Sequence, residues 1–114
     1  MPENFKQKQI DIALCAVFKK WKPAILCRLN QQGAIRFTEL LRSIPLTTNQ
    51  PITKKVLIQQ LRELEEHGLI ERKIFPEVPP RVEYNLTDYG KSTQVVIEEM
   101  IKWGESFGEN SQQI

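Results

Sequence analysis

The 114 residues are 40% hydrophobic and 26% charged, a composition typical of a soluble globular protein rather than of a disordered, collagen-like or membrane chain. The length predicts one domain over residues 1–114, with a core that needs no metal or disulfide crosslink. Neither a membrane-length apolar run nor the apolar core of a signal peptide occurs, and two cysteines are too few for a disulfide framework, so we expect a cytoplasmic protein.

The net charge of +2 conceals a strong segregation of charge along the chain. Residues 36–62 contain five basic side chains and one acidic side chain, whereas residues 63–71 contain four glutamates and neither lysine nor arginine. A basic segment followed by an acidic one indicates a surface suited to an anionic partner.

Apolar residues at helical spacing predict two helices in the first third of the chain. Ile10 and Leu14 belong to the apolar stripe of a helix over residues 7–19. A second helix is expected from Pro23 to Gly33, because proline is favoured in the first turn of a helix and glycine just after the last.

Residues 35–37 are expected to be extended, and a short third helix follows that Thr38 caps and that ends before Pro45. Two prolines, Pro45 and Pro51, forbid one continuous helix through residues 46–50. These residues are therefore expected to form a polar loop.

A fourth helix is expected after Thr53, because threonine is a favourable N-cap residue. Leu57, Leu61 and Leu64 fall on one face of this helix and predict that it packs on the core. Gly68 favours the end of the helix at that point, with the next residue packing back.

The last third of the chain is expected to form a β-hairpin and a final helix. Strand-like runs over residues 69–75 and 81–86 flank a loop with three prolines, which makes the tip of the hairpin stiff. Thr87 caps a last helix over residues 88–107. The order of the elements predicts a mainly α winged helix-turn-helix fold, with a small β-hairpin wing over residues 69–86 and extra terminal helices for dimerisation.

Four strings of residues carry a resemblance to a known family. They are Lys20-Trp21-Lys22, Arg36-Phe37-Thr38-Glu39-Leu40, Leu57-Ile58-Gln59-Gln60-Leu61-Arg62-Glu63-Leu64-Glu65 and Phe75-Pro76-Glu77-Val78-Pro79-Pro80-Arg81-Val82-Glu83-Tyr84-Asn85-Leu86-Thr87. With these strings the chain resembles the HxlR family, winged-helix regulators of bacteria and archaea, from about Ile10 to Gly104. The resemblance implies a homodimer clasped by its terminal helices, with the fourth helix in the major groove of DNA and the wing beside it.

The chain departs from the family pattern in two places. It has about five more residues than usual between Pro45 and Ile52, so the contacts of the turn that enters the recognition helix do not carry over. Redox-sensing members have a cysteine thirteen positions before the tryptophan of the Lys-Trp-Lys string, and that position here is Lys8. Cys15 is the remaining redox candidate; the alternative is that Cys15 and Cys27 are small buried residues.

The face of the fourth helix opposite its leucines carries side chains suited to DNA. Arg62 and Gln59 match the edges of guanine and adenine, Ile58 can touch a thymine methyl group, and Lys54 and Lys55 can reach phosphates. A solvated basic face is the alternative. Lysines at the start of the helix and glutamates at its end oppose the helix dipole, however, which indicates that function places them there.

In the wing, basic side chains flank the proline-stiffened tip. Arg81 is the first candidate to reach the backbone or minor groove of DNA, at little entropic cost. Alternatively, the prolines only protect an exposed hairpin edge. The full set of expected DNA-contacting residues is Arg36, Thr53, Lys54, Lys55, Ile58, Gln59, Arg62, Lys73 and Arg81.

Dimer contacts are expected from the first and last helices, because these carry more apolar residues than one small domain can cover. The expected interface residues are Ile10, Leu14, Ile97, Met100, Ile101, Trp103 and Phe107. Trp21 and Trp103 are interpreted as core or interface anchors rather than as ligand-stacking side chains.

With one histidine and five scattered glycines, the sequence lacks a metal cluster, a catalytic nucleophile with its base and a phosphate loop, so we expect neither an enzyme nor a cofactor. We expect a transcriptional repressor that binds a two-fold related double-stranded DNA operator as a homodimer, with a small-molecule or redox inducer that the sequence does not identify. A winged-helix module that binds proteins instead of DNA is the alternative, since fold does not dictate function.

Overall fold

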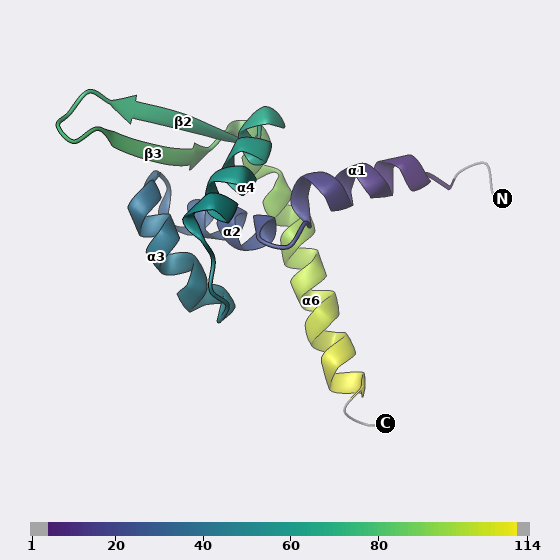
Figure 1. The fold of residues 1–114 in the computed structure, drawn as a ribbon. Coiled ribbons are helices and arrows are strands. Elements are labelled where there is room, and N and C mark those ends of the chain that lie inside the picture. The colour runs from purple at the N-terminus through teal and green to yellow at the C-terminus, as the bar shows by residue number, and fades with distance from the viewer. Residues whose placement is uncertain (1–4, 112–114) are drawn as a thin grey trace.

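The computed structural model describes residues 5–111, and Figure 1 shows how their helices and strands are arranged. In chain order the elements are α1 (Gln7–Val17), α2 (Lys22–Gln32), β1 (Ile35–Arg36), α3 (Phe37–Thr48), α4 (Lys54–Glu66), β2 (Ile70–Phe75), β3 (Arg81–Leu86), α5 (Asp88–Lys91) and α6 (Thr93–Ser111).

The three strands form an antiparallel sheet in the order β1-β3-β2. β2 and β3 pair along their whole length, from Ile70 opposite Leu86 to Phe75 opposite Arg81. This hairpin, the wing, extends beyond the helices with residues 76–80 at its tip (Figure 1). β1 adds a short pairing to β3 and ties the wing to the start of α3.

The core is formed mainly by α2, α3, α4 and the base of the sheet. Leu57, Leu61 and Leu64 are each no more than 1% exposed, which confirms the predicted core face of α4. The other core residues are Trp21, Ile25, Leu26, Leu29, Ile35, Leu40, Ile44, Leu69, Ile70, Tyr84, Leu86 and Ile97. The three leucines anchor one face of α4 in the core. The opposite, outer face of the helix therefore points in a fixed direction.

Both ends of α4 have the predicted caps. The Thr53 hydroxyl oxygen accepts a hydrogen bond from the Val56 N–H at 3.1 Å. At the other end Gly68 has a φ of 74°, and the Leu69 N–H donates to the Leu64 carbonyl at 3.0 Å. The chain can therefore turn directly from the end of α4 into β2.

The prediction for the third helix was wrong at both ends. α3 begins at Phe37, with Arg36 rather than Thr38 as its N-cap residue, and it continues through Pro45 to Thr48. Most of the expected loop over residues 46–50 is therefore helical. The additional residues after Pro45 lengthen the helix instead of enlarging a turn.

α3 continues for three residues beyond Pro45, and hydroxyl groups add hydrogen bonds in this last turn. Proline removes one backbone donor from a helix. The Thr47 and Thr48 hydroxyls donate to the carbonyls of Ser43 and Ile44, at 3.2 and 2.9 Å. Asn49, in the left-handed region with a φ of 56°, then ends the helix.

The predicted single helix over residues 88–107 is divided into α5 and α6. Thr87 caps α5 and not the long helix: its hydroxyl oxygen accepts from the Gly90 N–H at 2.9 Å. Gly90 lies against the Leu69 backbone so closely that a Cβ atom would overlap the Leu69 carbonyl. The Thr93 hydroxyl donates to the Gly90 carbonyl at 2.7 Å. In a continuous helix this carbonyl would serve as an acceptor for a backbone N–H.

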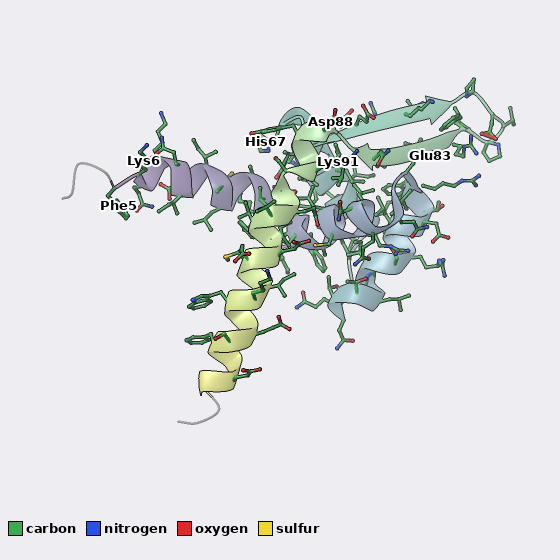
Figure 2. All side chains as sticks on the ribbon, turned by 180° about the vertical axis from the view of Figure 1, so that it is seen from behind. Phe5, Lys6, His67, Glu83, Asp88 and Lys91 are labelled. Carbon is green, nitrogen blue, oxygen red and sulfur yellow. The ribbon has the colours of Figure 1, made fainter. Side chains whose placement is uncertain are left out.

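α1 and α6 reach away from the body of the molecule in different directions (Figure 1). None of the α1 residues is buried. Seen from behind, the side chains of α1 and of the C-terminal half of α6 stand clear of the core (Figure 2). Within residues 5–111, no helix is long and apolar enough to cross a membrane.

Candidate nucleic-acid interface

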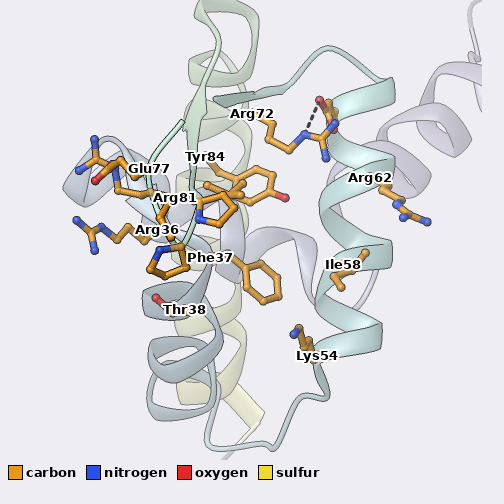
Figure 3. A pocket seen from close by; sticks show the side chains of 15 residues that line it. Arg36, Phe37, Thr38, Lys54, Ile58, Arg62, Arg72, Glu77, Arg81 and Tyr84 are labelled. Atoms are coloured by element: carbon orange, nitrogen blue, oxygen red, sulfur yellow. Dashed lines mark ion pairs between the residues drawn. The ribbon is translucent and has the colours of Figure 1, made fainter. Parts of the chain in front are cut away.

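A groove of about 590 Å³ lies between α4, the start of α3 and the wing (Figure 3). Lys54, Ile58 and Arg62 line its α4 side, and the aromatic rings of Phe37 and Tyr84 lie between α4 and the wing. Cationic side chains beside apolar surface can hold a phosphate backbone and the sugars attached to it.

A second hollow, of about 440 Å³, lies on the outer face of α4. It is lined by Lys54, Lys55, Ile58, Gln59 and Arg62. The structure thus brings together the five α4 side chains that the sequence placed on one face. Thr53 lies just before them as the N-cap residue, and its side chain is exposed.

The basic side chains of this face are free of carboxylate partners. Within the part of the chain that the structure describes, no ion pair is formed by Arg36, Lys54, Lys55 or Arg62. Some other basic side chains of the surface do pair with a carboxylate, as Lys102 does with Glu99 at 3.4 Å. Four unpaired cations therefore lie on or beside the outer face of α4, where an external anion can reach them.

Arg81 is turned back onto the wing, which departs from the expectation that it projects from the tip towards DNA. Its guanidinium carbon lies 3.9 Å from the centroid of the Phe75 ring, and its Nε lies 3.0 Å from a Glu77 carboxylate oxygen and 3.4 Å from one of Glu83. The register explains this arrangement, because Phe75 lies directly opposite Arg81. Two carboxylates and an aromatic face would compete with any external anion for this cation.

Lys73 remains more available than Arg81. Its side chain is exposed, and its ammonium lies 5.0 Å from the centroid of the Phe75 ring without a carboxylate partner among the described residues. Val78, at the tip of the wing, is fully exposed. The wing thus presents one free cation and an apolar tip.

Gln59 is held by a neighbour on its own helix. Its Nε2 donates to a Glu63 carboxylate oxygen at 2.8 Å, and the other oxygen of Glu63 accepts from the ammonium of Lys22 at 2.6 Å. The hydrogen bonds from Gln59 and then Lys22 hold the pKa of Glu63 below its ordinary value. Glu63 is therefore ionised at neutral pH.

The pairing of Lys22 with Glu63 was not predicted. The Lys22 side chain, in the Lys-Trp-Lys string, is fully buried. The two residues are 41 positions apart, so no local spacing rule could pair them. The only sequence signal for a buried Lys22 was its position beside a proline that starts an apolar helix.

Six of the seven expected interface residues are exposed. Ile10, Leu14, Met100, Ile101, Trp103 and Phe107 are between 45% and 66% exposed. Ile97 differs: it is 3% exposed and belongs to the core, because the first part of α6 packs on α2. It has no surface left to offer a second chain. Trp21 is also a core residue, which agrees with its interpretation as a core or interface anchor.

The two cysteines lie in different environments. Cys15 is exposed on α1, so the expectation that both are buried was wrong for this residue. Burial, together with the nearby Glu98, raises the pKa of the Cys27 thiol. Across residues 5–111, no three histidine, cysteine, aspartate or glutamate side chains come together in a way that could hold a metal ion.

Comparison with known proteins gives consistent matches. A family model described as HxlR-like helix-turn-helix matches residues 16–112. An HTH-type transcriptional regulator of Methanothermobacter thermautotrophicus is 42% identical over 103 residues, which cover 90% of this chain and 74% of that protein.

Two solved structures superpose on nearly the whole chain. One is described as a transcriptional regulator of the MarR family from Enterococcus faecalis V583; it has a TM-score of 0.79 and 36% identity, with 100% of this chain and 98% of that chain covered. The other is the reduced form of the redox regulator HypR, with a TM-score of 0.80 and 33% identity, covering 93% of this chain and 99% of that one. These likenesses confirm the predicted mainly α winged-helix fold.

Proposed function

The chain belongs to the HxlR-like helix-turn-helix family, whose matched relatives are transcriptional regulators, and from this membership we propose that it binds an operator in double-stranded DNA as a homodimer and represses transcription. The observation that carries the proposal is the set of unpaired cations on the outer face of α4, beside the groove. Such cations displace counterions condensed on DNA, which is the main source of affinity for the phosphate backbone. The role is binding in the cytoplasm rather than catalysis.

The side chains of the outer face divide into two roles by chemistry. Lys54 and Lys55, at the start of α4, act on phosphates and contribute affinity on any sequence. Gln59, Arg62 and Ile58 lie further along the helix and can reach base edges in the major groove. The helix is thus proposed to enter the groove with its first turns closest to the backbone.

The elements beside α4 extend the proposed contact. Arg36, at the end of β1, lines the groove, and Lys73, in β2, is an exposed cation of the wing outside the lining of the groove. Both cations can hold the DNA backbone. Thr53 contributes a hydroxyl at the N-terminus of α4, where backbone N–H groups also favour phosphate. Arg81 serves mainly to stiffen the wing.

The exposed terminal helices support the proposed homodimer. α1 has no buried residue, and the second half of α6 carries exposed apolar side chains over several turns. A stable homodimer interface is large and apolar. The two copies of α4 would then be related by a two-fold axis and require two related half-sites one or more helical turns apart.

Selection of bound duplexes from a random pool tests the function. We expect the wild-type protein to enrich a sequence with two related half-sites, and the Gln59→Ala and Arg62→Ala variants to lose preference at particular base pairs, each at a cost of about 1–3 kcal/mol. Lys91→Ala, on α5, is the matched control because Lys91 is exposed but pairs with Asp88. No enrichment by folded, dimeric protein would favour a protein-binding module instead.

A further inference from the structure

Lys22 carries a buried charge that the proposed DNA contact does not use. Its side chain is fully buried at the start of α2, yet its ammonium lies 2.6 Å from a carboxylate oxygen of Glu63 on α4. A buried ammonium is costly unless a charged partner and hydrogen bonds compensate it. Glu63 is therefore held in place from the core side of α4.

The second oxygen of Glu63 reaches the DNA-facing side of the same helix. It accepts from the Gln59 amide nitrogen at 2.8 Å. Gln59 is exposed, whereas the Glu63 side chain is 30% exposed and Lys22 is buried, so the three side chains form a line from the core to the surface. The line joins two helices and ends at a residue proposed to contact a base.

This line fixes which way the Gln59 amide faces. A free glutamine amide can turn over and exchange its oxygen and nitrogen. An ionised carboxylate can only accept hydrogen bonds, so only the N–H side of the amide can face Glu63. One N–H is then used, and the amide keeps one acceptor and one N–H donor for an outside partner.

One donor and one acceptor match adenine better than guanine. In the major groove, adenine presents an N7 acceptor and an N6 donor, whereas guanine presents two acceptors, N7 and O6. A freely turning glutamine could offer two N–H donors to guanine. We propose that Lys22 and Glu63 are positioning residues that preset Gln59 to select adenine over guanine at one base pair of each half-site. This inference rests on the proposed DNA-binding function.

The test compares base preference in Glu63→Gln with that of the wild type. The substituted amide keeps the size of the side chain but can donate as well as accept, so it no longer fixes the Gln59 amide. We expect the wild-type preference for adenine over guanine to be about tenfold or more and to fall below about threefold in Glu63→Gln. Affinity for random duplex should stay within about twofold, since phosphate contacts are unchanged.

Two further variants separate positioning from stability. In Lys22→Met with Glu63→Gln, no buried charge is left unpaired, so this variant keeps the test valid if Glu63→Gln alone does not fold. In Gln59→Ala with Glu63→Gln, the adenine preference should equal that of Gln59→Ala alone, because Glu63 acts only through Gln59. A merely structural role would produce additive losses on all sequences.

Three outcomes would overturn the inference. The adenine preference could survive in Glu63→Gln while Gln59→Ala abolishes it, or Glu63→Gln could weaken binding to every duplex equally. The base lost on Gln59→Ala could also be one other than adenine. In each case the protein still binds DNA, so the proposed function stands; a wild type without affinity for duplex would instead contradict both.

Discussion

Trp103 and Phe107 stack on one side of α6, with ring centroids 5.1 Å apart and planes inclined by 12°. Both side chains lie outside the core and are 66% and 57% exposed. Two stacked aromatic rings in water form apolar surface that a protein partner can cover. α6 thus carries the strongest candidate anchor for the proposed homodimer.

Replacing these rings should dissociate the dimer. We expect the wild type to have a dimeric mass by light scattering at micromolar concentration, and Trp103→Glu with Phe107→Glu to shift it to the monomer, because buried carboxylates would oppose the interface. Lys102→Glu is the matched control, since it changes the charge on the same helix without removing apolar surface. A double variant that stays dimeric would place the interface elsewhere.

Cys15 is expected not to act as a thiol switch. α1 ends at Val17, so Lys19 does not lie on the next helical turn, where its positive charge could activate the Cys15 sulfur. Cys15→Ser and the wild type should bind operator equally, before and after mild peroxide, in a gel-shift titration. Reversible loss of binding by the wild type alone would make this exposed thiol a sensor.

Two basic residues of the wing, Lys73 and Arg81, should differ clearly in their contribution to DNA binding. Lys73→Ala removes a free cation and should lower the slope of log affinity against log salt by about one unit. Arg81→Ala removes a cation already paired with Glu77 and Glu83, so the slope should stay unchanged. If Arg81→Ala lowered the slope and Lys73→Ala did not, Arg81 would leave its carboxylates to bind DNA.

Gly90→Ala should destabilise the fold. The added methyl group would overlap the Leu69 carbonyl, and relief requires the backbone of α5 or of the turn before β2 to move, at a cost of about 1–3 kcal/mol. Gly104→Ala, on α6, has no atom within 4 Å of the added carbon and should be neutral or stabilising by up to about 1 kcal/mol. Urea denaturation at one fixed protein concentration measures both, and equal effects would contradict the close approach.

Local rules predicted the parts of the fold that local contacts determine. The caps of α4 at Thr53 and Gly68 and the buried stripe of leucines followed from residue type and helical spacing. The division of the last helix did not, because it depends on Gly90 meeting Leu69, in a segment that the sequence alone does not bring close. The passage of α3 through Pro45 was not predicted either, because a proline inside a helix costs stability and favours the end of the helix before it.

The candidate site, too, was predicted only where local spacing determines it. Helical spacing was enough to place Lys54, Lys55 and Arg62 on one face, since they belong to one helix. The partners of Arg81 depend on hairpin register, and the partner of Lys22 lies on another helix, so neither could be derived from spacing. These pairings decide which charges remain free for an external partner.

Binding of duplex DNA through the outer face of α4 is tested most directly by the salt dependence of binding, measured by fluorescence anisotropy on one duplex at several salt concentrations. The wild type should lose affinity steeply as salt rises, and Lys54→Ala with Lys55→Ala should lower the slope by about two units, since each phosphate contact accounts for about one. Lys91→Ala should keep the wild-type slope. A wild-type affinity independent of salt, or one slope shared by all three proteins, would contradict the account.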